Sequence, residues 1–162
     1  MRIVKTAEER KNEILDVAEQ LFAEKGFDNL EFVRTNIKEA EGCLITGTRG
    51  WMIETKESLE GSDNRKIYER EKLRIQMCLD VLKEADPEHL KKHILMIHYP
   101  PVTAKQDFTE FAEMMAEGGV DICVYGHLHG KAHKKAFEGK FGSCEFICTS
   151  ADFVGFTPVR IV

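Results

Sequence analysis

The first part of the chain repeats apolar residues at every third or fourth position. Over residues 6–25 this spacing is typical of a helix that buries one face and exposes the other. Thr6 and Glu9 have the T-x-x-E spacing of a capping box, which supplies partners for the first free backbone amides. Gly26 stands where a left-handed C-terminal cap is expected, so the pattern predicts an amphipathic helix over 6–25. Its apolar stripe consists of Ile14, Val17, Ala18, Leu21 and Phe22.

A second long helix is predicted over residues 64–85, because apolar residues again recur there at helical spacing. Asp86-Pro87 ends it, since the residue before a proline is disfavoured in the helical conformation. The expected buried face consists of Tyr68, Ile75, Cys78, Leu79 and Leu82.

The segments between these two helices are shorter and less regular. Residues 37–41 suggest one turn of helix. Cys43–Gly47 is an apolar run of strand length that a glycine ends, and it predicts a buried strand. The polar stretch 54–64 is expected to be a loop.

The centre of the chain alternates strand and helix patterns. Residues 93–98 and 120–125 are apolar runs of strand length, and residues 107–117 between them have helical spacing and end at two glycines. Strand, helix and strand in this order are typical of a parallel crossover unit. From residue 131 onward, short apolar runs alternate with glycine turns, which predicts mainly antiparallel strands. The expected fold is therefore α/β, with a mixed sheet and flanking helices.

The composition is typical of a soluble globular domain. The 162 residues are 43% hydrophobic and 31% charged, and no apolar run approaches the ~20 residues that span a bilayer. The charged N-terminus does not have the apolar centre of a signal peptide. These features, with an odd number of cysteines and no C-x-x-C pair, predict a cytoplasmic protein whose thiols are reduced and buried. The cysteines are Cys43, Cys78, Cys123, Cys144 and Cys148.

Three histidines follow the ends of two predicted strands. His98 comes before Tyr-Pro-Pro at the end of the first strand of the crossover unit, and His127 and His129 lie between glycines after the second. If these strands are parallel neighbours, both loops reach the carboxyl edge of the sheet, where α/β folds place their ligands. Neutral imidazole is a common ligand of zinc, manganese and iron. The spacing therefore predicts a divalent metal site at these three residues.

Other candidate residues have weaker signals. A Cys144–Cys148 pair in a strand would be about 13 Å apart, too far for one ion. Arg49 follows the predicted strand 43–47 in a glycine-rich turn. It is either an ordinary surface residue or a phosphate-binding residue, since guanidinium is well shaped for phosphate. Three further histidines share no strand edge and are expected to be solvated or structural: His89, His93 and His133.

The motifs around these residues resemble those of calcineurin-like metallophosphoesterases. HYPP and GHLHG, separated by a strand, a helix and a strand, look like the last two motifs of that superfamily. LITGTRGW and FICTSADFVGF resemble segments of one bacterial branch. The resemblance covers residues 30–162 and implies part of a two-sheet sandwich with outer helices, which hydrolyses phosphate mono- or diesters with two divalent metals. By this resemblance, His98 and His127 ligate one metal and His129 ligates the other.

The resemblance is incomplete in the first part of the chain. The superfamily also uses D-x-H, G-D and G-N-H-D/E motifs, and residues 1–45 contain none of them. Three neutral imidazoles do not offset the repulsion between two cations as a bridging aspartate does. We therefore expect one divalent ion per chain (Mn, Fe or Zn) and a metal-dependent phosphoesterase-type domain that is weak or inactive alone. No catalytic residue is assigned.

The N-terminal segment resembles a different family. RKNEILDVAEQLFAEKGFDN, within residues 8–29, is similar to the first helix of TetR-type transcription regulators. A junction near residue 29 would then separate a regulator-like segment, 1–29, from a phosphoesterase-like domain, 30–162. No recognition helix follows, residues 1–40 hold nine Asp and Glu against seven Lys and Arg, and the net charge of the whole chain is −5. DNA binding usually needs a basic surface, so nucleic acid is not an expected partner.

Three functions stay open at this point. The first is a phosphoesterase that acts on a phosphorylated small molecule or phosphoprotein, alone or with its site completed by another chain. The second is a mononuclear three-histidine metal-binding protein, similar in chemistry to a carbonic-anhydrase centre. The third is a DNA-binding regulatory module built on the N-terminal segment. A sandwich without its first strands leaves apolar sheet surface uncovered, which also predicts homo-oligomers through the uncovered sheet.

Overall fold

The computed structural model describes residues 33–52, 63–103 and 105–162. The chain divides into two units at Phe32–Val33, and the fold described here is that of the second unit. Three features predicted from the sequence lie outside the described residues and stay predictions: the helix over 6–25, the regulator-like segment 8–29 and most of the polar loop 54–64.

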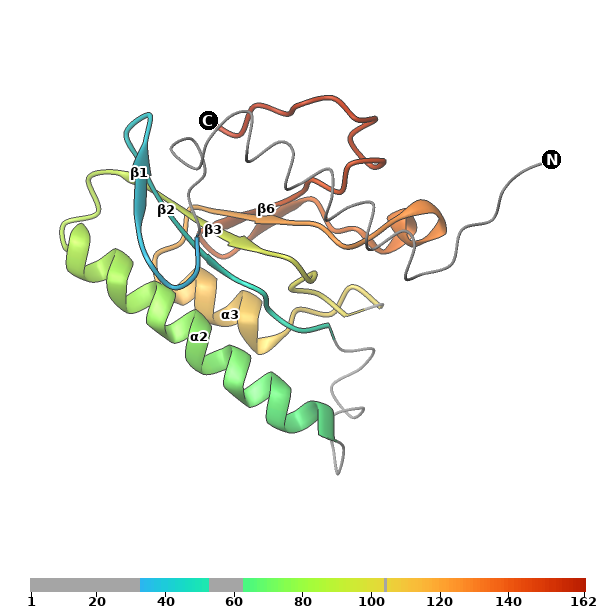
Figure 1. Cartoon of the computed structure of the whole chain (residues 1–162), viewed down its shortest axis with the longest axis horizontal. Coiled ribbons are helices and arrows are strands. Elements are labelled where there is room, and N and C mark those ends of the chain that lie inside the picture. The colour runs from blue at the N-terminus through green and yellow to red at the C-terminus, as the bar shows by residue number, and fades with distance from the viewer. Residues whose placement is uncertain (1–32, 53–62, 104) are drawn as a thin grey trace, which may run out of the picture. The chain divides into compact units, whose positions relative to one another are not determined.

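The described residues form one mixed six-stranded sheet with both α-helices of the described part on one side (Figure 1). The strands lie in the order β1-β2-β3-β4-β6-β5. Their bounds are β1 Lys38–Ala40, β2 Cys43–Thr48, β3 Lys92–Ile97, β4 Ile122–Tyr125, β5 Gly139–Phe141 and β6 Cys144–Cys148. The helices are α2 Asp63–Ala85, α3 Glu110–Glu117 and the 3-10 helix η2 Gly130–Lys135. The predicted α/β class, with a mixed sheet and flanking helices, is confirmed.

Four neighbouring strands of this sheet run parallel. β2 pairs with β3, β3 with β4 and β4 with β6, while β1 and β5 join the two edges antiparallel. The predicted crossover unit is confirmed, because β3 and β4 are parallel neighbours joined through α3. The prediction of mainly antiparallel strands in the last third is confirmed for β5 with β6 and is wrong for β6 with β4. β5 and β6 are antiparallel, but β6 lies inside the sheet beside β4, since its alternate side chains Cys144, Phe146 and Cys148 belong to the core.

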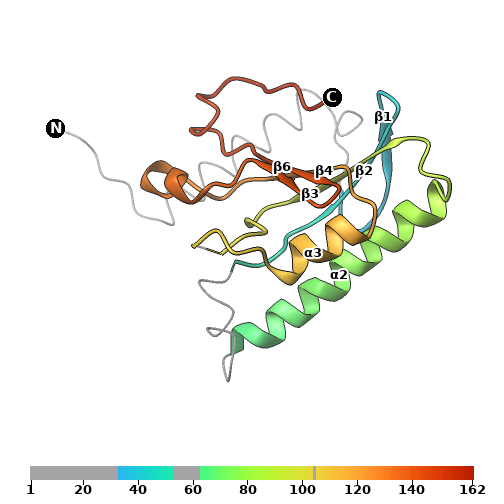
Figure 2. The same cartoon turned by 180° about the vertical axis from the view of Figure 1, so that it is seen from behind.

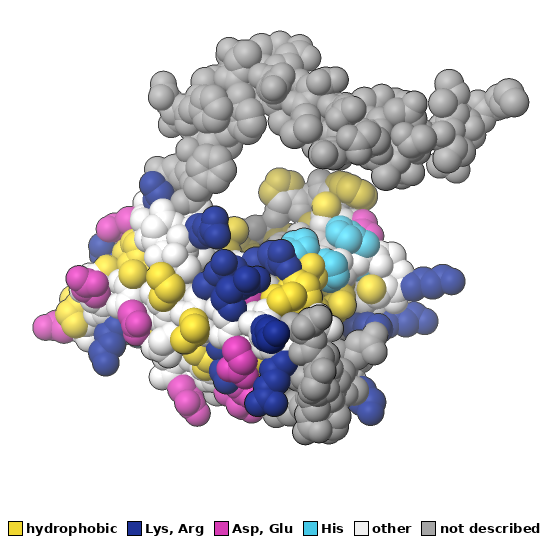
Figure 3. Space-filling view, turned by 60° about the horizontal axis from the view of Figure 1, so that its bottom comes forward, with side chains coloured by type: hydrophobic (Ala, Val, Ile, Leu, Met, Phe, Trp, Pro, Cys, Tyr) yellow, Lys and Arg dark blue, Asp and Glu magenta, His cyan; other side chains and the backbone are white. Residues whose placement is uncertain are grey.

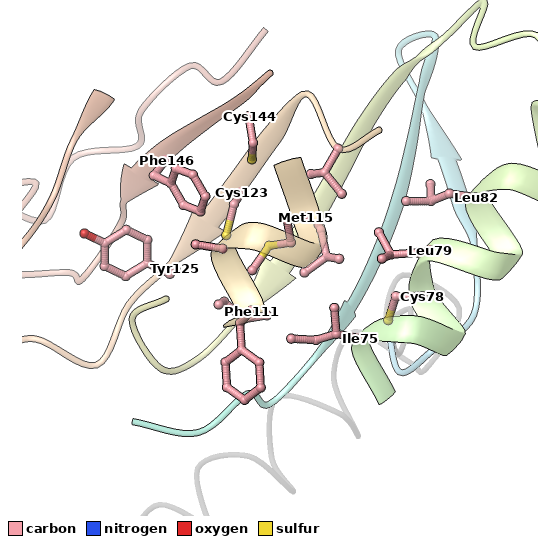
Figure 4. Packing of buried hydrophobic residues seen from close by; sticks show 14 of the residues in the cluster. Ile75, Cys78, Leu79, Leu82, Phe111, Met115, Cys123, Tyr125, Cys144 and Phe146 are labelled. Atoms are coloured by element: carbon pink, nitrogen blue, oxygen red, sulfur yellow. The ribbon is translucent and has the colours of Figure 1, made fainter. Parts of the chain in front are cut away.

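Helices α2 and α3 cover the same face of the sheet (Figures 1 and 2). Every residue predicted for the inner face of α2 is buried. Tyr68 of α2 stacks on Phe111 of α3 with the ring centroids 4.4 Å apart. Figure 4 shows side chains of both helices beside apolar side chains of β4 and β6. The apolar stripe in the sequence is therefore the surface that holds the helix layer on the sheet.

The segment before β2 is a strand, so the predicted helical turn over 37–41 is wrong. Residues 38–40 pair with β2 as β1, and the chain reverses at Glu41 and Gly42, whose φ angles are 49° and 75°. A two-residue reversal with positive φ at both positions suits a hairpin, because its twist matches that of the flanking strands. Pairing with β2 therefore outweighs the weak local helical pattern.

Helix α3 begins at Glu110, three positions after the predicted start at 107. Phe108 forms a β-bridge with Val102, and the Thr109 hydroxyl donates a 2.7 Å hydrogen bond to the carbonyl oxygen of Pro101. These contacts hold the residues before the helix in an extended conformation. The loop after β3 is consequently fastened at its far end.

The other face of the sheet is also apolar, and no described helix packs on it. Ile94, Ile122 and Val124 are buried there among partly buried isoleucines that include Ile161 near the C-terminus. Met96 is 45% exposed. The described part of the chain thus has one sheet layer and one helix layer, and association through this face stays a prediction. None of the described helices has the length and apolar character needed to cross a membrane.

Asp86 fastens the end of α2 to the start of β3. Its carboxylate accepts hydrogen bonds from the amides of Leu90 and Lys91, at 2.9 and 2.8 Å, and lies 3.2 Å from Nε2 of His93. The two amides are the main reason that the pKa of Asp86 lies below its ordinary value. Because His93 is 3% exposed and also lies 3.2 Å from the Gly119 carbonyl oxygen, it has a structural role.

Replacing Leu82 by alanine should lower the free energy of unfolding by about 2–5 kcal/mol, because a fully buried leucine leaves a cavity under the sheet. Leu73→Ala on the same helix is the matched control. Leu73 is 68% exposed, so its loss should change the stability by no more than about 0.5 kcal/mol. Urea denaturation followed by circular dichroism measures both, and equal losses would contradict the orientation of α2.

Replacing Asp86 by asparagine should make the free energy of unfolding less dependent on pH in the acidic range. The pKa of this carboxyl is lowered by folding, so its contribution is present above the ordinary value of 3.8 and is lost as the pH falls through the lower folded-state pKa. The wild type should therefore exceed the variant in stability near neutral pH, and the difference should shrink below pH 3.8. Denaturation at a series of pH values tests this, and a constant difference at all pH values would rule it out.

Candidate functional site

Polar side chains gather where the four parallel strands end. Arg49 follows β2, His98 follows β3, His127 and His129 follow β4, and Asp152 lies beyond the end of β6. Because these strands are parallel neighbours, their carboxyl ends share one edge of the sheet. Figure 3 shows histidine side chains at the surface beside Lys and Arg side chains. The fold therefore brings loops from distant parts of the sequence together at this edge.

The rings of His98 and His127 are in direct contact. Nε2 of His98 lies 3.0 Å from Nδ1 of His127, and the ring centroids are 4.9 Å apart. The amide of Gly126 donates to the carbonyl oxygen of His98 at 3.2 Å, which joins the two loops through the backbone. His127 has a φ of 71°, in the left-handed region that costs energy for a residue other than glycine. This backbone conformation is part of what brings the two rings together.

Arg49 is joined to the same loop through its backbone. Its carbonyl oxygen accepts hydrogen bonds from the amides of His98 and Tyr99, at 3.0 and 3.2 Å. Its guanidinium carbon lies 4.8 Å from the ring centroid of Trp51 and 5.6 Å from that of Tyr99. No carboxylate in the described ranges forms an ion pair with Arg49. The guanidinium is exposed and has hydrogen-bond donors for an anion.

His129 is held by Asp152 instead of by the histidine pair. Nδ1 of His129 lies 2.7 Å from one carboxylate oxygen of Asp152, and the Gly130 amide donates to the other at 2.9 Å. His133 Nε2 lies 3.1 Å from the same carboxylate, within ion-pair distance. These donors, the Gly130 amide foremost, hold the pKa of Asp152 well below its ordinary value. A neutral His129 that donates its Nδ1 proton to this carboxylate would present the Nε2 lone pair to a ligand.

The charges around His98 favour its neutral form. Partial burial lowers its pKa below the ordinary 6.5, and the positive charges of His127, Arg49 and His129 lower it further. A neutral imidazole has a lone pair for a cation, whereas an imidazolium has none. The electrostatics of this edge therefore suit a histidine that acts as a ligand near neutral pH.

The three predicted metal ligands are only partly assembled. A nitrogen–nitrogen distance of 3.0 Å between His98 and His127 is close to that of two neighbouring ligands on one ion, since zinc–nitrogen distances are about 2.0–2.1 Å. The donor types also fit a divalent transition metal. However, no group of three or more His, Cys, Asp or Glu side chains among the described residues is arranged to hold a metal ion. The three-histidine metal site stays a prediction.

Three residues at this edge were not identified from the sequence as site residues. Asp152 lies in a turn beyond β6, and its importance depends on the parallel pairing of β6 with β4, which local patterns did not indicate. Trp51 lies two positions after the predicted site residue Arg49, and Tyr99 lies one position after the predicted ligand His98. This closeness to predicted site residues was the only indication in the sequence that the two aromatic residues belong to the site. Both aromatic rings are partly buried beside Arg49.

A cavity of about 350 Å³ lies at the opposite edge of the sheet. Leu79 and Lys83 of α2, with His89 and His93 at the start of β3, form part of its lining. His93 is buried and His89 lies 2.9 Å from the carboxylate of Asp121. None of the lining residues belongs to the strand ends that carry the predicted ligands, so this cavity is separate from the candidate site.

Comparison with known proteins identifies no relative. No family model matches the chain, and neither the curated proteins nor the solved structures include a match.

With a chelator present, His98 should titrate below pH 6.5 in the metal-free protein, as followed by the NMR signals of its ring. Arg49→Ala should raise this titration midpoint but leave it below the ordinary value of 6.5, because the partial burial of His98 remains. Lys92→Ala is the control, since Lys92 is a cation at the other end of β3. If removal of Arg49 leaves the His98 midpoint unchanged, the two side chains do not interact as described.

Proposed function

We propose that the chain is a metal-dependent phosphoesterase-type domain that holds one divalent ion at the carboxyl edge of its sheet. The observation that carries this proposal is the meeting of His98, His127 and Arg49 where β2, β3 and β4 end. Two imidazole nitrogens suit a divalent cation, and a guanidinium suits a phosphate. The likeness of HYPP and GHLHG to metallophosphoesterase motifs supports the same reading.

The residues of this edge divide into two roles. His98 Nε2 and His127 Nδ1 would hold the ion, and His129 would add its free Nε2 nitrogen with Asp152 fixing the ring. A bound divalent ion would act as a Lewis acid and lower the pKa of water. Arg49 would bind the phosphate and offset its negative charge. η2 adds three exposed lysines directly after His129, which favour the approach of an anion: Lys131, Lys134 and Lys135.

We expect one ion per chain and slow hydrolysis. A two-metal site needs a carboxylate that bridges the ions. At this edge Asp152 is already engaged by His129 and the Gly130 amide. A single cation still activates water, so weak hydrolysis is compatible with the donor set. The sheet and its helix layer would correspond to one half of a metallophosphoesterase sandwich.

A mononuclear metal-binding protein without hydrolase activity is the second candidate. It is favoured by the contact between His129 and Asp152, which matches the carboxylate–histidine arrangement that orients ligands in metal sites. Metal content and hydrolysis, measured on the same sample, separate the two functions. The DNA-binding alternative depends on residues outside those described here.

Replacing both His127 and His129 by alanine should abolish tight binding of Zn or Mn, which we expect at no more than one ion per chain. Isothermal titration with each metal measures the stoichiometry and the affinity. His89→Ala is the matched control, because His89 lies on Asp121 at the opposite edge of the sheet. A double variant that still binds one equivalent would show that the ligands lie elsewhere.

Hydrolysis of a generic aryl phosphate with Mn should be slow in the wild type and absent in His98→Ala. The expected cause is the loss of one of the two neighbouring imidazole ligands, with the fold preserved because His98 belongs to neither hydrophobic core cluster. Circular dichroism checks the fold of the variant. Rapid hydrolysis by the wild type would contradict the single-ion proposal, and equal slow rates in both proteins would exclude His98 as a ligand.

A further inference from the structure

Arg49, Trp51 and Tyr99 form a cluster beside the histidine pair, which we call the aromatic shelf. The rings of Trp51 and Tyr99 meet edge to face with centroids 5.5 Å apart, and the guanidinium of Arg49 lies against both. Tyr99 also contacts His127, with ring centroids 4.4 Å apart. The shelf is therefore continuous with the proposed metal ligands.

The shelf is built on the core and on fixed backbone. Trp51 packs against the main hydrophobic cluster. Gly50 has a φ of 67°, and a Cβ atom there would lie 3.6 Å from Cβ of Ile97, so the loop runs close to the end of β3. The carbonyl oxygen of Arg49 accepts hydrogen bonds from the amides of His98 and Tyr99. The GTRGW loop and the HYPP loop are thus fixed to each other before any ligand arrives.

Arg49 presents two different surfaces from this position. Its N–H groups point along the plane of the guanidinium and suit the oxygens of a phosphate. The planar face of the guanidinium suits an aromatic ring, which it attracts through the ring quadrupole. Trp51 and Tyr99 hold the guanidinium by this same interaction and limit its rotation. In sites for single-stranded nucleic acids, aromatic side chains and arginine are the residues on which flat nucleobases stack.

We propose that the aromatic shelf selects phosphate esters whose alcohol part carries a flat aromatic group, in preference to purely aliphatic esters. This inference rests on the proposed function, because it takes the phosphate to lie between Arg49 and the histidine pair. The aromatic group then lies over the guanidinium of Arg49, which Trp51 and Tyr99 hold in place. A phenol and a nucleobase share this chemistry, so both are candidate sources of the aromatic group.

The shelf contains the only tryptophan of the chain, so intrinsic fluorescence reports directly on it. The test titrates the metal-free full chain, with a chelator present, against phenyl phosphate and methyl phosphate. Phenyl phosphate should change the Trp51 fluorescence at a roughly fivefold to tenfold lower concentration, the gain expected from one aromatic contact. Phosphotyrosine and adenosine monophosphate follow in the same assay, and the tighter of the two identifies the source of the aromatic group.

Two variants test the contribution of the shelf. Arg49→Lys keeps the positive charge but removes the planar face of the guanidinium. The ratio of the affinity for phenyl phosphate to that for methyl phosphate should therefore fall towards one, while methyl phosphate still binds. Tyr99→Leu should reduce the preference in the same way. His89→Ala, at the opposite edge, should leave both affinities unchanged. Circular dichroism confirms that each variant is folded.

Equal affinity for the two esters in the wild type, or a preference that survives both substitutions, would overturn the inference. That failure is distinct from failure of the proposed function, because the titration contains no metal and measures no hydrolysis. If the metal titration succeeds and the preference is absent, only the role of the shelf is wrong. If the preference is present but no metal binds, the phosphoesterase proposal fails and the shelf remains an aryl phosphate site.

Discussion

The parallel pairing of β2, β3, β4 and β6 is the constraint on which the candidate site depends. Parallel neighbours end at the same edge, so the loops that follow them meet even though they are far apart in the sequence. Arg49, His98, His127 and Asp152 each come from a different one of these loops. If one strand ran in the opposite direction, its loop would lie at the far edge of the sheet.

Charge at this edge is arranged in favour of an anion or a metal–anion pair. The carboxylate of Asp152 is engaged by the Gly130 amide and His129. No carboxylate in the described part of the chain forms an ion pair with Arg49. Partial burial, together with electrostatic repulsion from His127 and Arg49, keeps the pKa of His98 low. A histidine pair that includes His98, whose pKa is lowered, beside an exposed arginine is a suitable arrangement for a cation and a phosphate together, which is the basis of the proposed function.

The two faces of the sheet differ in what covers them. One face is buried under α2 and α3, whose apolar stripes meet the alternate side chains of the strands. The other face has its own apolar cluster, which includes Ile94, Ile122 and Val124. Burial on both faces is typical of parallel strands, which are usually covered on both sides. Both faces of the parallel strands therefore hold apolar clusters, and the described helices α2 and α3 cover one of them.

The sequence alone determined the helix α2 with its buried face, the crossover unit of β3, α3 and β4, and the histidines at its strand ends, because periodicity and spacing are local properties. It did not determine β1, the start of α3 or the parallel position of β6, since pairing with a distant strand and the contacts of the loop after β3 decided these. Only the tertiary structure separated His129, held by Asp152, from the pair His98 and His127, and placed Trp51 and Tyr99 against Arg49. The physical reason is that side-chain partners depend on which strand ends become neighbours, and long-range pairing leaves no periodic signal in the chain.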